Sequence, residues 1–114
     1  MNLIFKIAAA EEWSLAKAKG AFEGAGVDRA DGYIHFSAAS QVAETAAKWF
    51  AGRSDLVLAA IDADALGAAL RWEPGRGGAL FPHLYAPLPL STVVWTRALL
   101  LGPDGRHIVG NLEA

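Results

Sequence analysis

The chain has 114 residues, 54% hydrophobic and 19% charged, which is long enough for one buried core and too apolar for a disordered protein. Ten basic and twelve acidic residues give a net charge of −2, so no electrostatic pattern favours binding to duplex nucleic acid. The absence of cysteine excludes disulfides, a thiol nucleophile and a cysteine zinc site. We therefore expect a single domain over residues 1–114.

The sequence shows neither a basic and apolar leader nor an apolar run of about 18 residues. These patterns argue against export and against a membrane partner. A cytoplasmic location is the resulting expectation, and the oligomeric state stays open.

Apolar periodicity and turn residues predict the following elements in chain order. The predicted strands cover residues 2–7, 33–37, 55–62, 70–73, 80–85 and 92–101, with a last short strand near 106–110. The predicted helices cover residues 8–20, a segment beginning at Ser37 or Ser40, and a turn at 63–70, while residues 21–32 predict a loop.

Five local details accompany these elements. Gly20 is the expected stop of the first helix, and Trp13 is expected to point inward. Val42, Ala46, Trp49 and Phe50 form one helical stripe that should pack on the sheet. Residues 55–62 have the continuous apolar character of a central strand, whereas Pro82 predicts an edge strand or a bulge.

The element order, two strand–helix units followed by several strands, predicts an α+β fold with two main helices and a small mixed or antiparallel sheet. Neither GxGxxG nor GxxxxGK[ST] is present, so a doubly wound nucleotide fold and a P-loop are not expected.

Period-2 alternation places polar and aromatic side chains together on three of the predicted strands. These faces contain Tyr33, His35 and Ser37 in one strand, Phe81, His83 and Tyr85 in a second, and Arg71 and Glu73 in a third. Three such faces, each backed by apolar residues, are what a sheet lining a cleft would present.

Structural roles compete with functional ones at these positions. The Ser37 hydroxyl could cap the following helix, and either histidine could be a hydrogen-bonded sheet residue without chemistry. Arg71 and Glu73 could form a solvated ion pair. Scattered histidines with no HExxH spacing predict no metal site, and without a GxSxG elbow a serine hydrolase is a poor hypothesis.

The strings DGYIHFS, LRWE and FPHLYAPLPLSTVV, in this order, resemble the small bacterial family called domain of unknown function 952. The resemblance covers the chain from the first strand through the PLPL segment. It implies a fold similar to the catalytic core of ADP-ribosyltransferases and RNA 2′-phosphotransferases. By position, Lys6 would be the first-strand contact, and Glu73 or His83 would approach the ribose-orienting position.

The leading hypothesis is a cleft that binds NAD, ADP-ribose or another small nucleotide, in an enzyme of ADP-ribosyl- or phosphoryl-transfer type. Its predicted catalytic residues are His35, Glu73 and His83, and its predicted ligand-binding residues are Lys6, Tyr33, Ser37, Arg71 and Tyr85. The alternative is a non-catalytic ligand-binding or interaction module with the same fold.

Overall fold

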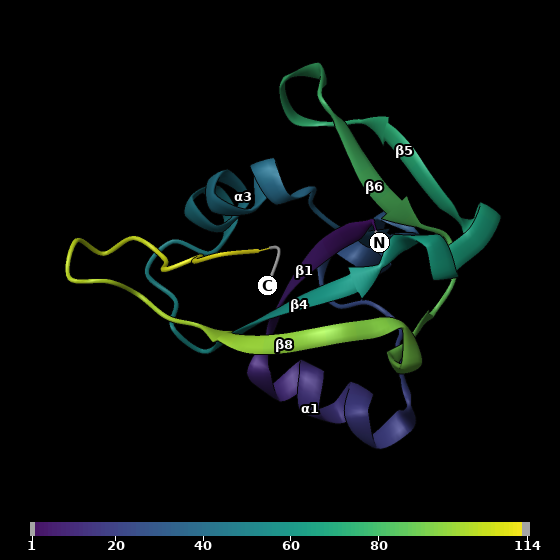
Figure 1. The fold of residues 1–114 in the computed structure, drawn as a ribbon, viewed down its shortest axis with the longest axis horizontal. Helices are drawn as coiled ribbons and strands as arrows, with labels where there is room; N and C mark the ends of the chain where they lie inside the picture. Colours follow the sequence, from purple (N-terminus) through teal and green to yellow (C-terminus); the bar gives the residue numbers. More distant parts are fainter. Residues whose placement is uncertain (1, 113–114) are drawn as a thin grey trace.

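A three-stranded antiparallel sheet lies at the centre of the structure, a computed structural model that describes residues 2–112. Its strands are β1 (Leu3–Ala9), β4 (Leu56–Asp62) and β8 (Val93–Leu99), with β4 in the middle (Figure 1). The prediction that the apolar run 55–62 forms a central strand is therefore confirmed. The strands are antiparallel, so the apolar run reflects burial on both faces of the sheet.

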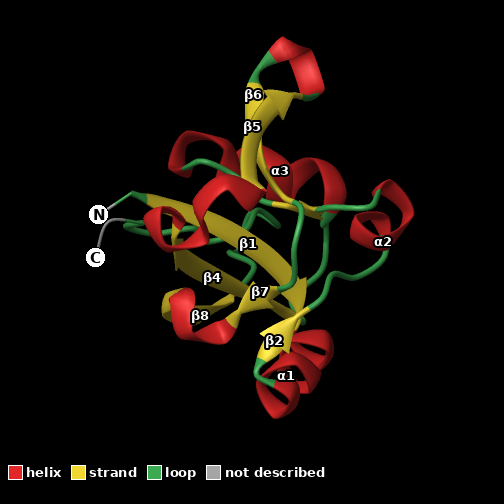
Figure 2. Cartoon of the chain, turned by 90° about the vertical axis from the view of Figure 1, so that its right-hand side faces the viewer, coloured by secondary structure: helices red, strands yellow, loops and turns green. Residues whose placement is uncertain are grey.

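A second antiparallel sheet has the order β3 (Ile34–His35), β6 (Leu80–Leu84) and β5 (Leu70–Pro74). The β5–β6 hairpin projects from the body of the molecule (Figure 2). An isolated bridge between Phe5 and Ser37 links the segment after β3 to the free edge of β1. This bridge holds β1 beside β3, the strand that carries His35.

Two short strands and several helical segments complete the fold. The short strands β2 (Ala21–Phe22) and β7 (Leu88–Pro89) pair with each other. The α-helices are α1 (Ala10–Lys19), α2 (Val27–Asp31) and α3 (Val42–Trp49). The 3-10 segments are η1 (Ala39–Gln41), η2 (Ala63–Ala69), η3 (Arg76–Gly78) and η4 (Leu90–Thr92).

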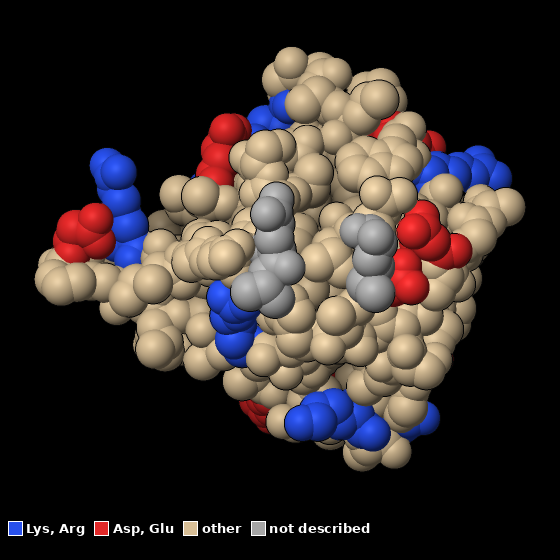
Figure 3. Space-filling view, in the orientation of Figure 1, with Lys and Arg blue, Asp and Glu red and all other residues tan. Residues whose placement is uncertain are grey.

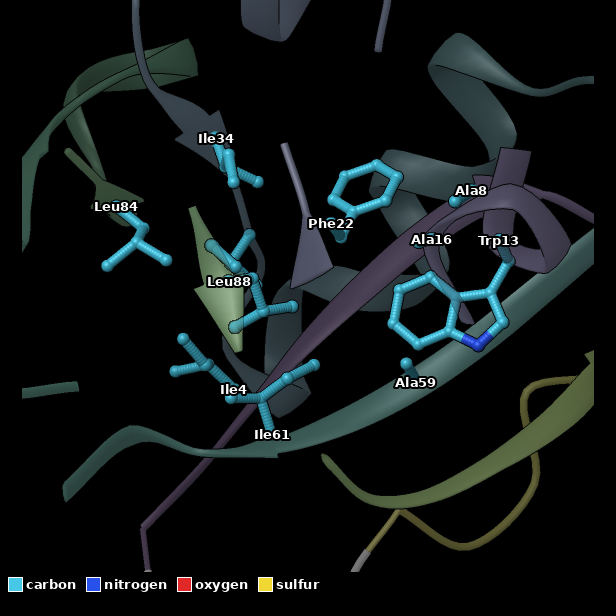
Figure 4. Packing of buried hydrophobic residues seen from close by; sticks show 11 residues of the cluster. Ile4, Ala8, Trp13, Ala16, Phe22, Ile34, Ala59, Ile61, Leu84 and Leu88 are labelled. Carbon is cyan, nitrogen blue, oxygen red and sulfur yellow. The ribbon is translucent and has the colours of Figure 1, made fainter. Parts of the chain in front are cut away.

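Buried side chains form two hydrophobic clusters, one on each face of the central sheet. The cluster on the α1 side contains Ile4, Ala8, Trp13, Ala16, Phe22, Ile34, Phe36, Ala59, Ile61, Leu84 and Leu88 (Figure 4). The cluster on the α3 side contains Phe5, Ile7, Val42, Ala46, Leu56, Leu58, Ala60 and Leu99. Alternate residues of β1 and β4 thus feed opposite clusters, which fixes the register of these strands.

The first helix follows its sequence signals closely. Gly20 adopts the left-handed conformation with φ 84° and its N–H donates to the carbonyl oxygen of Ala16. Trp13 is buried against Phe22. Both predictions for this helix are confirmed.

The segment 21–32 is not the plain loop that was predicted, because it contains β2 and α2. Helix α2 has only five residues, too few for a periodic apolar pattern to appear in the sequence. Gly32, at φ 85°, ends it by donating its N–H to the carbonyl oxygen of Asp28. This helix turns out to carry the central carboxylate of the site.

Two predictions about the next helix are wrong. Ser37 does not cap it, because α3 begins at Val42 and the Ser37 hydroxyl instead donates to Thr45 Oγ1 at 3.3 Å. Trp49 does not pack inward with Val42 and Ala46, since 66% of its surface is exposed. The helix ends at Trp49, whereas Phe50, the last residue of the stripe, packs against the cluster on the α3 side as predicted.

Pro82 lies in the middle strand of its sheet, which corrects the prediction of an edge strand or a bulge. Its carbonyl oxygen accepts a hydrogen bond from the Phe36 N–H, at a position just beyond the end of β3. The nitrogen of Pro82, which has no N–H to donate, therefore lies beyond the end of β3, where the ladder of hydrogen bonds between β3 and β6 has ended. The predicted last strand near 106–110 is reduced to a single bridge between Leu101 and His107.

The α+β class with antiparallel sheets and two main helices on the central sheet is confirmed. None of the described helices is long and apolar enough to cross a lipid bilayer. The resemblance to the ADP-ribosyltransferase core stays a prediction.

Substituting Leu58 tests the central position of β4. Leu58 is fully buried, so Leu58→Ala should lower the free energy of unfolding by about 2–5 kcal/mol. Trp49→Ala removes a larger but exposed side chain and should change it by less than about 0.5 kcal/mol. Urea unfolding followed by circular dichroism measures both values. A larger loss for Trp49→Ala would contradict the packing described above.

Candidate functional site

A buried carboxylate, Asp28, organises one half of the site. Its oxygens accept hydrogen bonds from Lys6 Nζ at 3.0 and 3.2 Å and from the backbone N–H groups of Ala25 and His35 at 3.1 and 2.9 Å. Asp28 Oδ1 also lies 2.7 Å from Nδ1 of His35. One side chain therefore joins β1, α2 and β3.

The charges of this group stabilise one another in spite of their burial. Burial would raise the pKa of Asp28, but the hydrogen bonds from His35 and the charge of Lys6 outweigh it and lower that pKa to about 2. Burial lowers the pKa of Lys6 from its ordinary value, and Asp28 opposes that shift. We infer that Asp28 is ionised throughout the neutral range.

His35 is held between two carboxylates. Its Nδ1 contacts Asp28, and its Nε2 lies 2.9 Å from Oδ2 of Asp31. An ionised carboxylate can only accept hydrogen bonds. Both ring nitrogens thus each face a carboxylate oxygen, an arrangement in which each can act as a donor.

A second imidazole–carboxylate pair lies beside the first. His83 Nδ1 is 2.9 Å from Oε1 of Glu73, and the Tyr85 hydroxyl donates to the same oxygen at 2.7 Å. The bonds from Tyr85 and His83 lower the pKa of Glu73, and the bond to Glu73 raises the pKa of Tyr85. Because Glu73 accepts at Nδ1, the lone pair of neutral His83 lies on Nε2, which has no hydrogen-bond partner within residues 2–112.

Tyr33 packs against both histidines. Its ring centroid lies 4.7 Å from that of His35, 4.2 Å from that of His83 and 5.1 Å from that of Tyr85. The two imidazole centroids are 5.3 Å apart, because His35 and His83 are directly paired across β3 and β6. Partial burial, together with Asp31 and Glu73, raises the pKa of the Tyr33 hydroxyl.

An open cleft of about 580 Å³ runs beside these groups, within the size range of small-molecule sites. Both histidines line it, and so do Lys6, Tyr33 and Ser37. Aromatic walls are supplied by Phe5, Phe22, Phe36, Trp49, Phe50 and Phe81. Charged lining residues of both signs are Lys6, Arg53, Arg76, Glu12, Asp28 and Asp31.

The predicted site residues fall into two groups in space. His35, Glu73, His83, Tyr33 and Tyr85 form one connected cluster, as alternation along the strands indicated. Arg71 and Lys6, which were also predicted as site residues, make other contacts.

Arg71 stacks on Tyr85 at 5.0 Å. Arg71, Glu73 and Tyr85 do not line the cleft. The three N–H bonds of Lys6 already have acceptors on Asp28 and on the carbonyl oxygen of His35. A ligand could contact Lys6 only by displacing one of them.

Several residues of the site escaped the sequence analysis, notably Asp28 and Asp31. A signal for Asp28 was present: Lys6 is a lone charge in an apolar strand, and a buried lysine requires an acidic partner. The sequence carried no comparable signal for Arg53 and Arg76, which lie in turn segments and line the cleft.

Within residues 2–112, no group of three or more histidine and acidic side chains is arranged to hold a metal ion. On the face drawn in Figure 3, basic and acidic side chains gather in small separate groups rather than in one broad patch of a single sign. On this face, charge is thus distributed in small local groups.

Fold and site together define a small α+β domain with a histidine-lined cleft at the free edge of its central sheet. The chain belongs to the family described as "Protein of unknown function (DUF952)", whose model matches residues 7–96. That range includes both histidines and their carboxylate partners. The predicted family is therefore confirmed.

The chain is also similar to protein CC0527 from Caulobacter crescentus. A crystal structure of that protein is 55% identical over 95% of both chains, with a TM-score of 0.91, and its V27M/L66M double mutant is 53% identical over the same share, with a TM-score of 0.90. Its solution NMR structure is 55% identical over 96% of this chain and 95% of that one, with a TM-score of 0.86. No protein of curated function matches the chain.

Removing the Asp28 carboxylate should destabilise the fold. Asp28→Asn leaves Lys6 buried without its counter-charge, and we expect a loss of about 3–5 kcal/mol in the free energy of unfolding. Asp31→Asn, which alters an exposed partner of the same histidine, should cost about 1 kcal/mol or less. Chemical unfolding at pH 7 measures both, and equal effects would contradict a central role for Asp28.

The same carboxylate should contribute to acid unfolding. Its pKa of about 2 lies below the ordinary value of 3.8, so its stabilisation is present above pH 4 and is lost as the pH falls from 4 to 2. The loss attributable to this group is about 2 kcal/mol. Unfolding curves between pH 2 and pH 5 should show this component in the natural chain and lack it in Asp28→Asn.

Proposed function

We propose that the cleft binds a small nucleotide-like ligand, with NAD and ADP-ribose as reference compounds, and that His83 and His35 transfer protons on it. One observation carries the proposal. A histidine whose Nε2 has no partner among the described residues lies beside a second histidine whose two nitrogens both contact carboxylates, 5.3 Å from centroid to centroid, at the wall of a cleft.

The two imidazoles are suited to opposite halves of an acid–base reaction. His83 Nε2 can take a proton from water or a ligand hydroxyl, while Glu73 holds Nδ1 and stabilises the charge that forms. The oxygen so activated attacks phosphorus or the anomeric carbon of a ribose as the bond to the leaving group breaks. When that leaving group needs a proton, His35 can give one from Nε2.

Such a proton transfer requires His35 Nε2 to exchange its bond to Asp31 for one to the ligand. The Asp31 side chain is 42% exposed, and an exposed ion pair contributes about 1 kcal/mol or less. The bond from Nδ1 to buried Asp28 can stay intact during this exchange. His35 would thus keep its orientation while one nitrogen becomes available.

The walls of the cleft support the ligand class. Aromatic side chains offer faces on which a base or nicotinamide ring can stack, and two arginines offer donors to phosphate oxygens. The volume of about 580 Å³ suits a compound of mononucleotide to dinucleotide size. Residues of both signs around the cleft agree less well with a large polyanionic RNA.

A second candidate, a binding module without catalysis, is favoured by one contact. Asp28 and Asp31 satisfy both nitrogens of His35, as expected for a purely structural histidine. In that case the cleft would bind the ligand but leave it unchanged.

The function can be tested on the full chain with NAD, ADP-ribose and AMP. We expect each active ligand to shift the NMR signals of Tyr33 and His83, and chromatography to detect released nicotinamide or phosphate. His83→Gln removes the base at Nε2 and should lower the rate about 10²- to 10⁴-fold with little change in affinity.

His107→Gln is the matched control, because His107 does not line the cleft and its side chain bonds the backbone carbonyl oxygen of Arg53. Its rate should stay within about twofold of the natural chain. Binding without turnover would favour the module. If none of the three compounds perturbs the cleft signals, the proposed function is wrong.

A further inference from the structure

Arg76 lines the cleft but takes no part in the proposed acid–base reaction of His35 and His83. Arg76 lies in η3 at the tip of the β5–β6 hairpin and lines the cleft, with its side chain 19% exposed. Its guanidinium lies over the ring of Phe81 at 5.1 Å, its Nε donates to Glu44 Oε1 at 2.9 Å, and its Nη2 donates to Thr45 Oγ1 at 3.3 Å.

These contacts leave three N–H bonds of the guanidinium available. An arginine has five N–H bonds, and the contacts to Glu44 and Thr45 use two of them. Among the described residues, no acceptor lies within hydrogen-bond distance of Arg76 Nη1. Three N–H bonds, two on Nη1 and one on Nη2, are therefore available to oxygens of a phosphate or carboxylate.

The hairpin holds the guanidinium in place. The N–H of Gly75 donates to the carbonyl oxygen of Ala79 at 2.8 Å, and a Cβ on Gly75 would lie 2.6 Å from the Phe81 ring, so only glycine lets the ring pack under the loop. Gln41 Nε2 donates to the carbonyl oxygen of Leu80 at 2.8 Å and ties the hairpin to η1. A donor fixed in advance loses little conformational entropy when it binds.

The carboxylate that now neutralises Arg76 is easily replaced. The Glu44 side chain is 73% exposed, and an ion pair with so exposed a partner contributes little to stability. A ligand anion on the remaining N–H bonds of Arg76 could compete with Glu44 or join it. Arg76 is thus fixed in position while its counter-ion is exchangeable.

Two routes connect Arg76 to the histidine pair. Phe81 and His83 are two residues apart on the same face of β6, which places them about 7 Å apart along the strand. On the facing segment, Ser37 follows His35 by two residues, and its hydroxyl donates to the Thr45 oxygen that Arg76 also contacts. Arg76 therefore lies roughly one ring-sized group beyond His83.

We propose that Arg76, with Thr45 beside it, is the subsite for the anionic group of the ligand, a phosphate monoester or a carboxylate. Phe81 then supports the ring attached to that group, and the opposite end of the ring reaches His83 Nε2. This inference rests on the proposed function, because it assigns one end of the ligand in the same cleft. It makes Arg76 the residue that sets the ligand's orientation.

The test compares adenosine, AMP, the 5′-carboxylate of adenosine and inorganic phosphate by calorimetry and by the arginine Nε–H NMR signals of the full chain. We expect AMP to bind at least about tenfold more tightly than adenosine and to shift the Arg76 signal. Arg76→Gln should reduce that preference to about threefold or less and leave adenosine binding unchanged. Arg76→Lys, which keeps the charge without the planar edge, should restore only part of it.

Two other arginines serve as comparisons in this experiment. Arg97 stacks on Trp95 at 3.9 Å outside the cleft, so Arg97→Gln removes the same charge and should leave the AMP preference intact. Arg53 lines the cleft and pairs with Asp55, which makes it the rival anion contact. If Arg53→Gln abolishes the preference and Arg76→Gln does not, the assignment to Arg76 is overturned.

The outcomes separate this inference from the function beneath it. Adenosine binding at Tyr33 and His83 without any phosphate preference would overturn the anion subsite and leave the proposed function standing. Absence of binding by every compound would overturn both. A preference shared by AMP and the 5′-carboxylate supports the subsite for either anion, and a preference for AMP alone identifies it as a phosphate site.

Discussion

The buried ion pair between Lys6 and Asp28 is the constraint on which the site depends. A lysine on an apolar strand costs free energy unless a fixed acceptor meets it, and Asp28 does so while also binding the backbone and ring of His35. The pair therefore joins the central sheet, helix α2 and strand β3 at one carboxylate. Its value lies less in net stability than in forcing His35 into one orientation at the edge of the cleft.

Strand pairing then brings the second histidine to the first. The direct opposition of His35 and His83 across β3 and β6 follows from the same register that buries Ile34 and Leu84. A shift by one residue would expose both apolar side chains and separate the imidazoles. Core packing thus specifies the geometry of the polar cluster, and Tyr33 fills the space between the rings.

Period-2 alternation was enough to predict which polar side chains share a face, and the cluster of His35, Glu73, His83 and the two tyrosines follows from it. Central strand β4 was equally predictable from its apolar run. Lys6 in an apolar strand signals that an acidic partner exists, but the sequence could not show that this partner is Asp28, because a five-residue helix carries no periodic signal. Trp49 and Ser37 were misread because the bounds of α3 depend on tertiary contacts such as the Ser37–Phe5 bridge.

The carboxylates that hold His35 and Arg76 are of two kinds, one buried and two exposed. Asp28 is buried and shared among three partners, so displacing it would leave a charge unpaired. Asp31 and Glu44 are exposed, and within residues 2–112 each holds only one cationic partner, so each pair contributes little to stability. The buried acid therefore fixes the orientation of His35, whereas the exposed acids contact His35 Nε2 and Arg76 from the surface.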